Sequence, residues 1–231
     1  MKETDNGILL NRITYSDNSL ITTFFTEKSG IQKFVFLGGK KKSGNLLPLG
    51  IYELTYYKRP DSELGKINQV VLVNSMHSIF ANPLKSVITF FISEILYQSI
   101  KSEEKDAGLF VFITNEILLL ENESHVKAYP ALFLLKYISF LGIKPHIEDD
   151  NAMFFDLEQG VFSSNSLKLD RSLSSNAILV IRNWLLEKED VNYNLEANSK
   201  EIVSILLAYL AIHIPNFKGQ KSLELVREIL H

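Results

Sequence analysis

The residues best suited to chemistry in this sequence are three consecutive lysines, Lys40-Lys41-Lys42, set between Gly39 and Gly44. The apolar run before them predicts a strand that leads into a loop. Glycines let a backbone approach a phosphate group closely, and lysines neutralise its charge. Three interpretations are open for this loop: a nucleotide-binding site, a nucleic-acid contact, or a solvated turn.

The nucleotide interpretation fails the requirements of a phosphate-binding P-loop. That motif continues after its second glycine with lysine and then serine or threonine, at the start of a helix. Here Asn45 and Leu46 occupy those positions, and Pro48 opposes a helix that begins there. The sequence favours a nucleic-acid contact or a solvated loop, and the surrounding elements must decide between the two.

Residue types that support catalysis or metal binding are scarce elsewhere. The chain has no cysteine, which excludes thiolate nucleophiles, disulfides and thiolate metal sites. The five histidines lack the spacing of a helical ligand pair, and the acidic run at residues 148–150 lacks the glycine of a calcium loop. We therefore predict a protein that is not an enzyme and has no metal site or cofactor. An enzyme with an unrecognised site remains a third interpretation.

The composition is that of a globular protein outside the membrane. Of the 231 residues 46% are hydrophobic, including 15 Phe and 9 Tyr, which is enough for a sizeable core. The N-terminal stretch, MKETDNG, is too polar for a signal peptide, and no apolar run reaches the length of a membrane span. We expect a cytoplasmic protein with no membrane partner.

Charge is distributed unevenly along the chain. Residues 1–77 hold 10 Lys and Arg against 7 Asp and Glu, whereas residues 78–231 hold 14 against 20. The first part is therefore mildly basic and the second part acidic, which suggests different partners for the two parts.

The basic first part predicts β-structure. Five short runs rich in β-branched and aromatic residues, separated by turn residues, predict strands at residues 7–14, 19–25, 31–37, 50–58 and 66–73. A small closed barrel would accommodate them without leaving exposed sheet edges. We assign residues 1–77 to this barrel domain.

From Asn82 the hydrophobic period becomes that of helices, and we assign residues 78–231 to a helical domain. Asn82 and Pro83 fit the start of its first long helix. Further helices are predicted at residues 106–120, 129–141, 174–187, 199–212 and 222–230. One interruption, at residues 154–162, indicates a short β-hairpin. The aromatic clusters Phe90-Phe91 and Phe110-Phe112 are expected in the core.

The barrel carries residue types typical of a nucleic-acid binder. Small barrels of this kind bind single strands through a basic groove and stacking aromatic side chains. Tyr56 and Tyr57 are adjacent in a predicted strand, so they point to opposite faces and at most one is exposed. The candidate DNA-binding residues are Arg12, Tyr15, Lys33, Lys40, Lys41, Lys42, Tyr57, Lys58 and Arg59.

The order of motifs resembles the RecO family of bacterial recombination mediators. Residues 7–30, GILLNRITYSDNSLITTFFTEKSG, are similar to the family's opening, and the basic loop and residues 46–57 follow in the family's order. Residues 129–142 and 206–230 resemble its later helical segments, in a Bacteroidetes-like version. The resemblance implies an α+β chain with an N-terminal five-stranded OB-type barrel and a C-terminal helical domain that carries the small hairpin.

The resemblance also implies a function in DNA repair. Members of this family bind single- and double-stranded DNA, anneal strands, and help load recombinase onto DNA coated by single-strand-binding protein. They act with RecR and recognise the C-terminal tail of the coating protein, which implies a nucleoid-associated location. Many members hold zinc with four cysteines where this chain has the hairpin of residues 154–162. We expect packing by Phe154, Phe155 and Phe162 to replace that metal.

An acidic tail that ends in an aromatic residue needs an apolar pocket and a cation for its carboxylate. The candidate partner-binding residues are Phe133, Lys136, Tyr137, Phe140 and Lys144. The competing interpretation is that these aromatic residues are core and both lysines are solvated. The sequence pI of about 6.0 also leaves an alternative function open, a protein–protein adaptor without useful DNA affinity.

Overall fold

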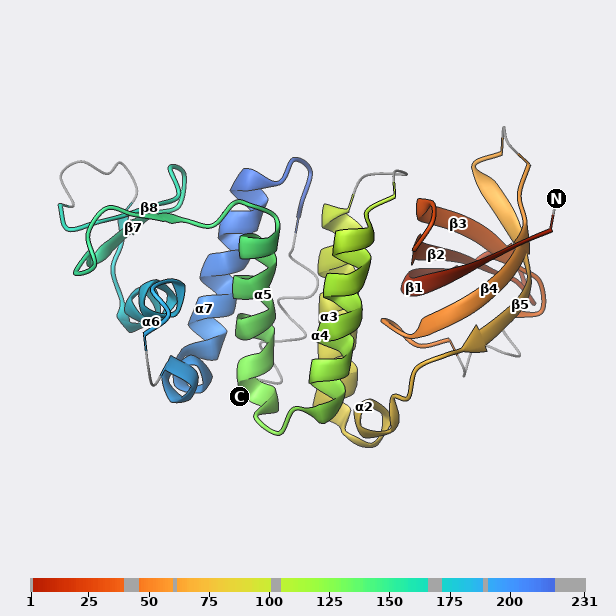
Figure 1. The fold of residues 1–231 in the computed structure, drawn as a ribbon, viewed down its shortest axis with the longest axis horizontal. Coiled ribbons are helices and arrows are strands. Elements are labelled where there is room, and N and C mark those ends of the chain that lie inside the picture. The colour runs from red at the N-terminus through yellow and green to blue at the C-terminus, as the bar shows by residue number, and fades with distance from the viewer. Residues whose placement is uncertain are drawn as a thin grey trace. The chain divides into compact units, whose positions relative to one another are not determined.

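The computed structural model of the 231-residue chain describes residues 2–39, 46–59, 62–100, 105–165, 172–188 and 191–218. The chain forms two compact units, Met1–Glu123 and Ser124–His231. Across the described ranges, no helix has both the length and the apolar character needed to cross a membrane. Figure 1 shows the elements of each unit.

Five strands close into a barrel in the first unit, as predicted (Figure 1). Around the barrel their order is β1-β2-β3-β5-β4. Only β3 and β5 run parallel, and the other neighbours are antiparallel. The strands are β1 (Lys2–Thr14), β2 (Leu20–Thr26), β3 (Gly30–Phe36), β4 (Ile51–Tyr57) and β5 (Leu64–Leu72).

Aromatic side chains fill the barrel. The Phe24 ring meets those of Phe34 and Tyr52 edge-on, with ring centroids 6.1 and 6.0 Å apart. Tyr56 is buried against Phe34, at a centroid distance of 4.7 Å, whereas Tyr57 is 44% exposed. The prediction that at most one of this tyrosine pair faces solvent is confirmed. At Gly65 a Cβ atom would lie 2.6 Å from the Phe34 ring, so glycine permits the close approach of β5 to β3.

Among the described residues of the first unit, three helices follow the barrel: α2 (His77–Ala81), α3 (Pro83–Ser99) and α4 (Ala107–Asn122). The Asn82 side chain caps α3, as predicted, by accepting hydrogen bonds from the Leu84 and Lys85 amides. The core prediction is confirmed for Phe91 but is wrong for Phe90, which is 49% exposed. Successive helical residues point about 100° apart, so both rings of such a pair rarely face one core.

The helices of this unit cover part of the barrel's outer surface. Helix α3 lies against β1, and the Phe110 ring of α4 contacts that of Phe25 on β2 at a centroid distance of 6.1 Å. The outward-facing residues Ile8, Leu10 and Phe25 are consequently buried. Strands thus give way to helices between residues 72 and 77, but the compact unit continues to Glu123. Residue 77 as a domain boundary stays a prediction.

A buried lysine ties the three helices together. The Lys85 Nζ atom donates to the Ser78 hydroxyl and to the Glu121 carbonyl, both at 2.7 Å. The Glu121 carboxylate in turn accepts hydrogen bonds from the Ser78 and Ile79 amides at the start of α2. This arrangement satisfies backbone donors that a helix N-terminus otherwise leaves without partners.

The second unit combines helices with a small sheet. Its sheet has the strand order β6-β8-β7-β9, so the predicted hairpin, β7 with β8, is confirmed and extended by a short strand on each side. The predicted helix at residues 222–230 lies outside the described residues. The elements are η2 (Val126–Ala128), α5 (Tyr129–Phe140), β6 (His146–Ile147), β7 (Phe154–Asp156), β8 (Val161–Ser163), β9 (Ser172–Leu173), α6 (Asn176–Leu185) and α7 (Val191–His213).

Aromatic packing holds the hairpin. Phe155 and Phe162 are buried and stacked, with ring centroids 4.4 Å apart, and Tyr209 of α7 contacts Phe155 at 5.7 Å. The Tyr209 hydroxyl donates to the Ile143 carbonyl at 2.9 Å. Phe154 is only partly buried. The expected packing is therefore found at two of the three predicted phenylalanines, with Tyr209 as an additional member.

Candidate nucleic-acid interface

One row of paired residues runs around the outside of the barrel. Ile13 of β1 pairs with Ile21 of β2, which pairs with Val35 of β3. Val35 in turn pairs with Lys66 of β5. Lys66 pairs with Tyr57 of β4, and Tyr57 pairs with Lys2, back on β1. We call this row the outer belt: Ile13, Ile21, Val35, Lys66, Tyr57 and Lys2.

The side chains of the outer belt point away from the barrel core. Directly paired residues share a face of the sheet, and successive residues alternate between faces. The strand neighbours Phe34, Tyr56 and Ile67 are buried inside the barrel. Their belt neighbours therefore face outward, and Ile13 is 53% exposed.

The outer belt has an aliphatic half and a cationic half. Ile13, Ile21 and Val35 follow one another on β1, β2 and β3, and Lys66, Tyr57 and Lys2 continue on β5, β4 and β1. Within the described part of the chain, the side chains of Lys2 and Lys66 are engaged in no ion pair or hydrogen bond. Their charges are therefore available to an anionic ligand.

Other cations adjoin the cationic half. Lys33 is exposed on β3, two residues before Val35. Lys58 and exposed Arg59 directly follow Tyr57, and the Lys58 ammonium donates to the Gln32 side-chain oxygen. The Lys58 ammonium is thereby directed to the inner face, because Gln32 is buried and pairs with the core residue Phe24. The structure thus brings together three of the residues predicted to bind DNA: Lys33, Tyr57 and Arg59.

Sequence reasoning missed Lys2 and Lys66. The first predicted strand began at residue 7, whereas β1 begins at Lys2 and reaches Tyr57 on β4. The sequence predicts a strand at Lys66 but not which residues lie beside it on the sheet. Its neighbour Val35 follows from the parallel pairing of β3 with β5, and local sequence patterns do not reveal that pairing. The only available signal was the alternation Lys66-Ile67 at the start of an apolar run.

Arg12 lies on the opposite face of the sheet from the outer belt. It pairs with Thr22, whose side chain is buried and donates to the Phe34 carbonyl. Burial raises the pKa of the Tyr52 hydroxyl to about 12, and the Arg12 charge acts in the opposite direction. Arg12 is therefore directed toward the mouth of the barrel near Tyr52, away from Lys33 and Tyr57.

Tyr15 belongs to a different part of the barrel surface from Tyr57. Tyr15 is 61% exposed in the turn after β1, two residues beyond Ile13. Lys40, Lys41 and Lys42 lie outside the described residues. The described glycine before them, Gly39, lies against Phe36 and Leu20. A phosphate contact by the three lysines stays a prediction.

The carboxylates near the start of β1 are directed away from the outer belt. Asp5 is buried beside Leu54, and its Oδ2 accepts a hydrogen bond from the Lys28 amide at 3.2 Å. Burial raises the pKa of this carboxyl above its usual value of 3.8. The Glu3 carboxylate accepts a hydrogen bond from the buried Tyr56 hydroxyl at 3.1 Å. Both carboxylates therefore lie on the inner face, where Lys2 and Tyr57 are not.

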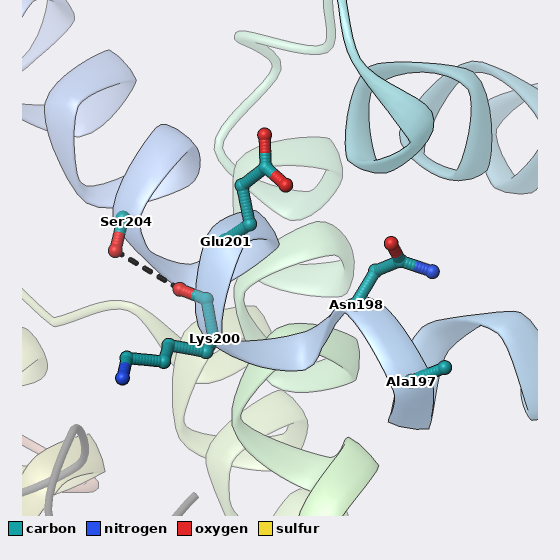
Figure 2. A pocket seen from close by; sticks show the side chains of 5 residues that line it. All are labelled: Ala197, Asn198, Lys200, Glu201 and Ser204. Carbon is teal, nitrogen blue, oxygen red and sulfur yellow. Dashed lines mark hydrogen bonds between the residues drawn. The ribbon is translucent and has the colours of Figure 1, made fainter.

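The described residues of the second unit, Ser124–His231, offer no comparable convergence of polar groups. A depression on its surface is lined by side chains of a single helix, α7 (Figure 2). The Ser204 hydroxyl there donates to the Lys200 carbonyl within that helix. The described residues contain no group of three or more His, Asp or Glu that could hold a metal ion. The residues that line the depression are Ala197, Asn198, Lys200, Glu201 and Ser204.

The five candidate partner-binding residues divide between core and surface. Phe133 and Tyr137 are fully buried in α5 and stack on each other at a centroid distance of 5.6 Å. These two aromatic residues therefore belong to the core, which agrees with the alternative that the aromatic residues of this segment are core residues. Phe140 is 40% exposed, Lys144 is exposed and Lys136 is partly buried. A docking site at Phe140 and the two lysines stays a prediction.

Comparison with known proteins identifies both parts of the chain. The family model for the N-terminal part of recombination protein O matches residues 1–76, and that for its C-terminal part matches residues 81–222. Similar proteins named DNA repair protein RecO include those of Flavobacterium psychrophilum, 27% identical, and Bacteroides fragilis, 26% identical; each alignment covers 96% of this chain and 97% of the relative. A third, from Porphyromonas gingivalis, is 24% identical over 91% of this chain and 92% of its own. The chain belongs to the recombination protein O family.

Proposed function

We propose that this protein acts in DNA repair and recombination as a non-enzymatic mediator and binds DNA through the barrel surface around the cationic half of the outer belt. The family membership and the name shared by its relatives support the role in repair. The observation that carries the assignment of the surface is the pairing of Lys66 with Tyr57 on an uncovered face of the barrel. This pairing joins a phosphate-binding charge to a base-stacking ring.

The charge distribution along the chain favours the barrel, residues 1–77, over residues 78–231 as the DNA-binding part. The belt lysines are exposed, and the nearest carboxylates of β1 are turned inward. Lysine contacts to phosphate release counterions, so binding through them must weaken as salt concentration rises. The helical part is acidic and is therefore less suited to bind phosphate groups.

The proposal extends to the finer activities that the family resemblance implies. These are annealing of complementary strands, and loading of recombinase together with RecR onto DNA coated by single-strand-binding protein. The exposed Phe140 ring and the charge of Lys144 are suited to the coating protein's acidic C-terminal tail. A Lys136→Glu, Lys144→Glu variant should bind a synthetic tail peptide more weakly in calorimetry, with Lys188→Glu as an exposed control. Equal affinity of both variants would place the tail site elsewhere.

A second candidate is a protein–protein adaptor of the same repair complex. Large apolar side chains on α3 and α4 are exposed, among them Phe90, Val111 and Leu119. Exposed apolar residues of this kind favour a protein partner. The acidic overall charge agrees with this alternative.

Fluorescence anisotropy with labelled single-stranded and duplex oligonucleotides separates the two candidates. The DNA-binding proposal predicts saturable binding at low salt that weakens steadily as salt is added. Absence of binding to either oligonucleotide at low salt would reject the proposal and favour the adaptor.

A further inference from the structure

We infer that a single strand of DNA crosses the barrel along the outer belt, perpendicular to the β-strands, with Tyr57 as a stacking platform beside Lys66. This inference rests on the proposed DNA-binding function and adds the path, the preferred strand state and the central residues. The pairings of the five strands define the path without a break from Ile13 to Lys2.

The length of the outer belt suits a short single strand. Neighbouring strands lie about 4.8 Å apart, so the five steps from Ile13 to Lys2 span about 24 Å along the curved surface. Small barrels of this type occupy about 4–16 nucleotides. A path of this length fits the lower end of that range.

The chemistry of the outer belt matches unpaired bases. Tyr57 presents an exposed ring between Lys66 and Lys2, to which it is directly paired on either side. Ile13, Ile21 and Val35 continue the path with apolar surface that a phosphate backbone cannot use. In a duplex the base faces are stacked on one another, so only an unpaired strand can place bases on the ring and phosphates on the lysines together.

The described helices of the first unit cover the middle of the β1–β2 surface but not the outer belt. The outward residues Ile8, Leu10 and Phe25 are buried, so the middle of the β1–β2 surface cannot receive a strand. Ile13 and Tyr57, at either end of the uncovered part, are exposed. A ligand that crosses from β2 to β4 along the outer belt passes over Val35 and Lys66.

The residues on either side of the outer belt carry no negative charge that would repel an anionic ligand. The residues two positions away on the same strand faces carry no carboxylate, and one of them is a further lysine. Within the strands these flanking residues are Thr4, Asn11, Thr23, Lys33, Thr55, Leu64 and Asn68.

The test compares variants of the full chain for binding to labelled oligothymidylate and to a duplex of equal length. Tyr57→Ala should weaken binding of the single strand about tenfold, because one stacked base is lost, and should change duplex binding much less. Tyr57→Phe keeps the ring and should bind as the wild type does. Lys66→Ala should reduce the slope of log affinity against log salt by about 0.7 for the single strand. Lys127→Ala, which replaces an exposed lysine of the second unit, is the matched control and should change neither the affinity nor the salt slope.

The possible outcomes separate this inference from the proposed function. If the Tyr57→Ala and Lys66→Ala variants bind single-stranded DNA as the wild type does, the proposed path along the outer belt is wrong, although DNA binding itself stands. An equal loss of single-strand and duplex binding in Tyr57→Ala would overturn the preference for the single strand. Failure of the wild type to bind either DNA would overturn the proposed function and this inference together. Thermal melting by circular dichroism confirms that each variant is folded.

Discussion

Lys66 and Tyr57 are direct partners across strands β5 and β4, on a barrel face that the helices leave uncovered. The pairing depends on a register shift in β5, because Tyr56 pairs with Ile67 but Thr55 pairs with Gln69. Such an irregularity redirects side chains locally. Here it leaves Tyr56 and Ile67 inside the barrel while Lys66 and Tyr57 face outward together.

The basic loop gives a prediction that is independent of the outer belt. Replacement of Lys40, Lys41 and Lys42 by alanine should weaken binding to single-stranded DNA and make the salt dependence shallower, because each lost phosphate contact removes about 0.7 from the slope. Salt titrations followed by anisotropy measure both quantities. An unchanged affinity and slope would show that the loop is a solvated turn.

The hairpin in the helical unit should depend on its aromatic packing. Phe162 is buried and stacks on Phe155, so Phe162→Ala should lower the free energy of unfolding of that unit by about 3–5 kcal/mol. Phe140→Ala, at a ring that is 40% exposed, should cost less than Phe162→Ala does. Urea denaturation followed by circular dichroism makes the comparison. Because the chain has no cysteine, we expect a chelator to leave the wild-type transition unchanged; a lower transition with chelator would contradict this account of the hairpin.

Asp5 should make stability depend on pH in the acid range. Burial raises the pKa of this carboxyl in the folded state above its ordinary value of 3.8, so the folded state binds the proton more tightly than the unfolded state does. The resulting stabilisation is complete below pH 3.8 and is lost as pH rises through the raised pKa. An Asp5→Asn variant should lack this contribution. The difference in unfolding free energy between wild type and variant should therefore fall with rising pH, and a difference that is constant with pH would refute the assignment.

Lys85 should be important for the packing of the first unit. Its ammonium group is buried and makes two hydrogen bonds, one to Ser78 and one to the Glu121 carbonyl. Lys85→Ala should lower the free energy of unfolding by about 2–4 kcal/mol, since hydrogen bonds from a charged donor are lost in a buried site. Lys105→Ala, an exposed lysine of the same unit, should change it by less than about 0.5 kcal/mol. Equal effects of the two variants in urea denaturation would exclude the structural role of Lys85.

The architecture was predictable from the sequence because its signals are local. Alternating β-branched and aromatic residues gave the five strands, and Asn82-Pro83 gave the start of α3. Helix α2 was missed because its five residues are too few to show a period. The start of α7 at Val191 was placed eight residues too late, since the polar run before Ser199 hides the apolar period.

The candidate site was predictable only in part, because long-range pairing determines which residues meet. Lys33 and Tyr57 are 24 positions apart, and only the insertion of β5 between β3 and β4 shows that Lys66 lies between them. The sequence groups Arg12 with Lys33 and Tyr57, but in the structure Arg12 pairs with the buried Thr22 on the opposite face. The strand irregularity between Leu9 and Asn11 that sets this pairing leaves no signal in the sequence. Burial of Phe133 and Tyr137 likewise depends on packing that helical spacing alone does not specify.

The central claim is that the uncovered barrel face around Lys66 binds DNA. Its most direct test is the affinity of a Lys33→Glu, Lys66→Glu variant for labelled single-stranded DNA, measured by anisotropy at low and moderate salt. Lys127→Glu, Lys188→Glu serves as a control of equal net charge, with both lysines exposed in the helical unit. We predict that the barrel variant loses most of its affinity at low salt and much of its salt dependence, whereas the control binds almost as the wild type does. Equal affinities of the barrel variant and the control would contradict the claim.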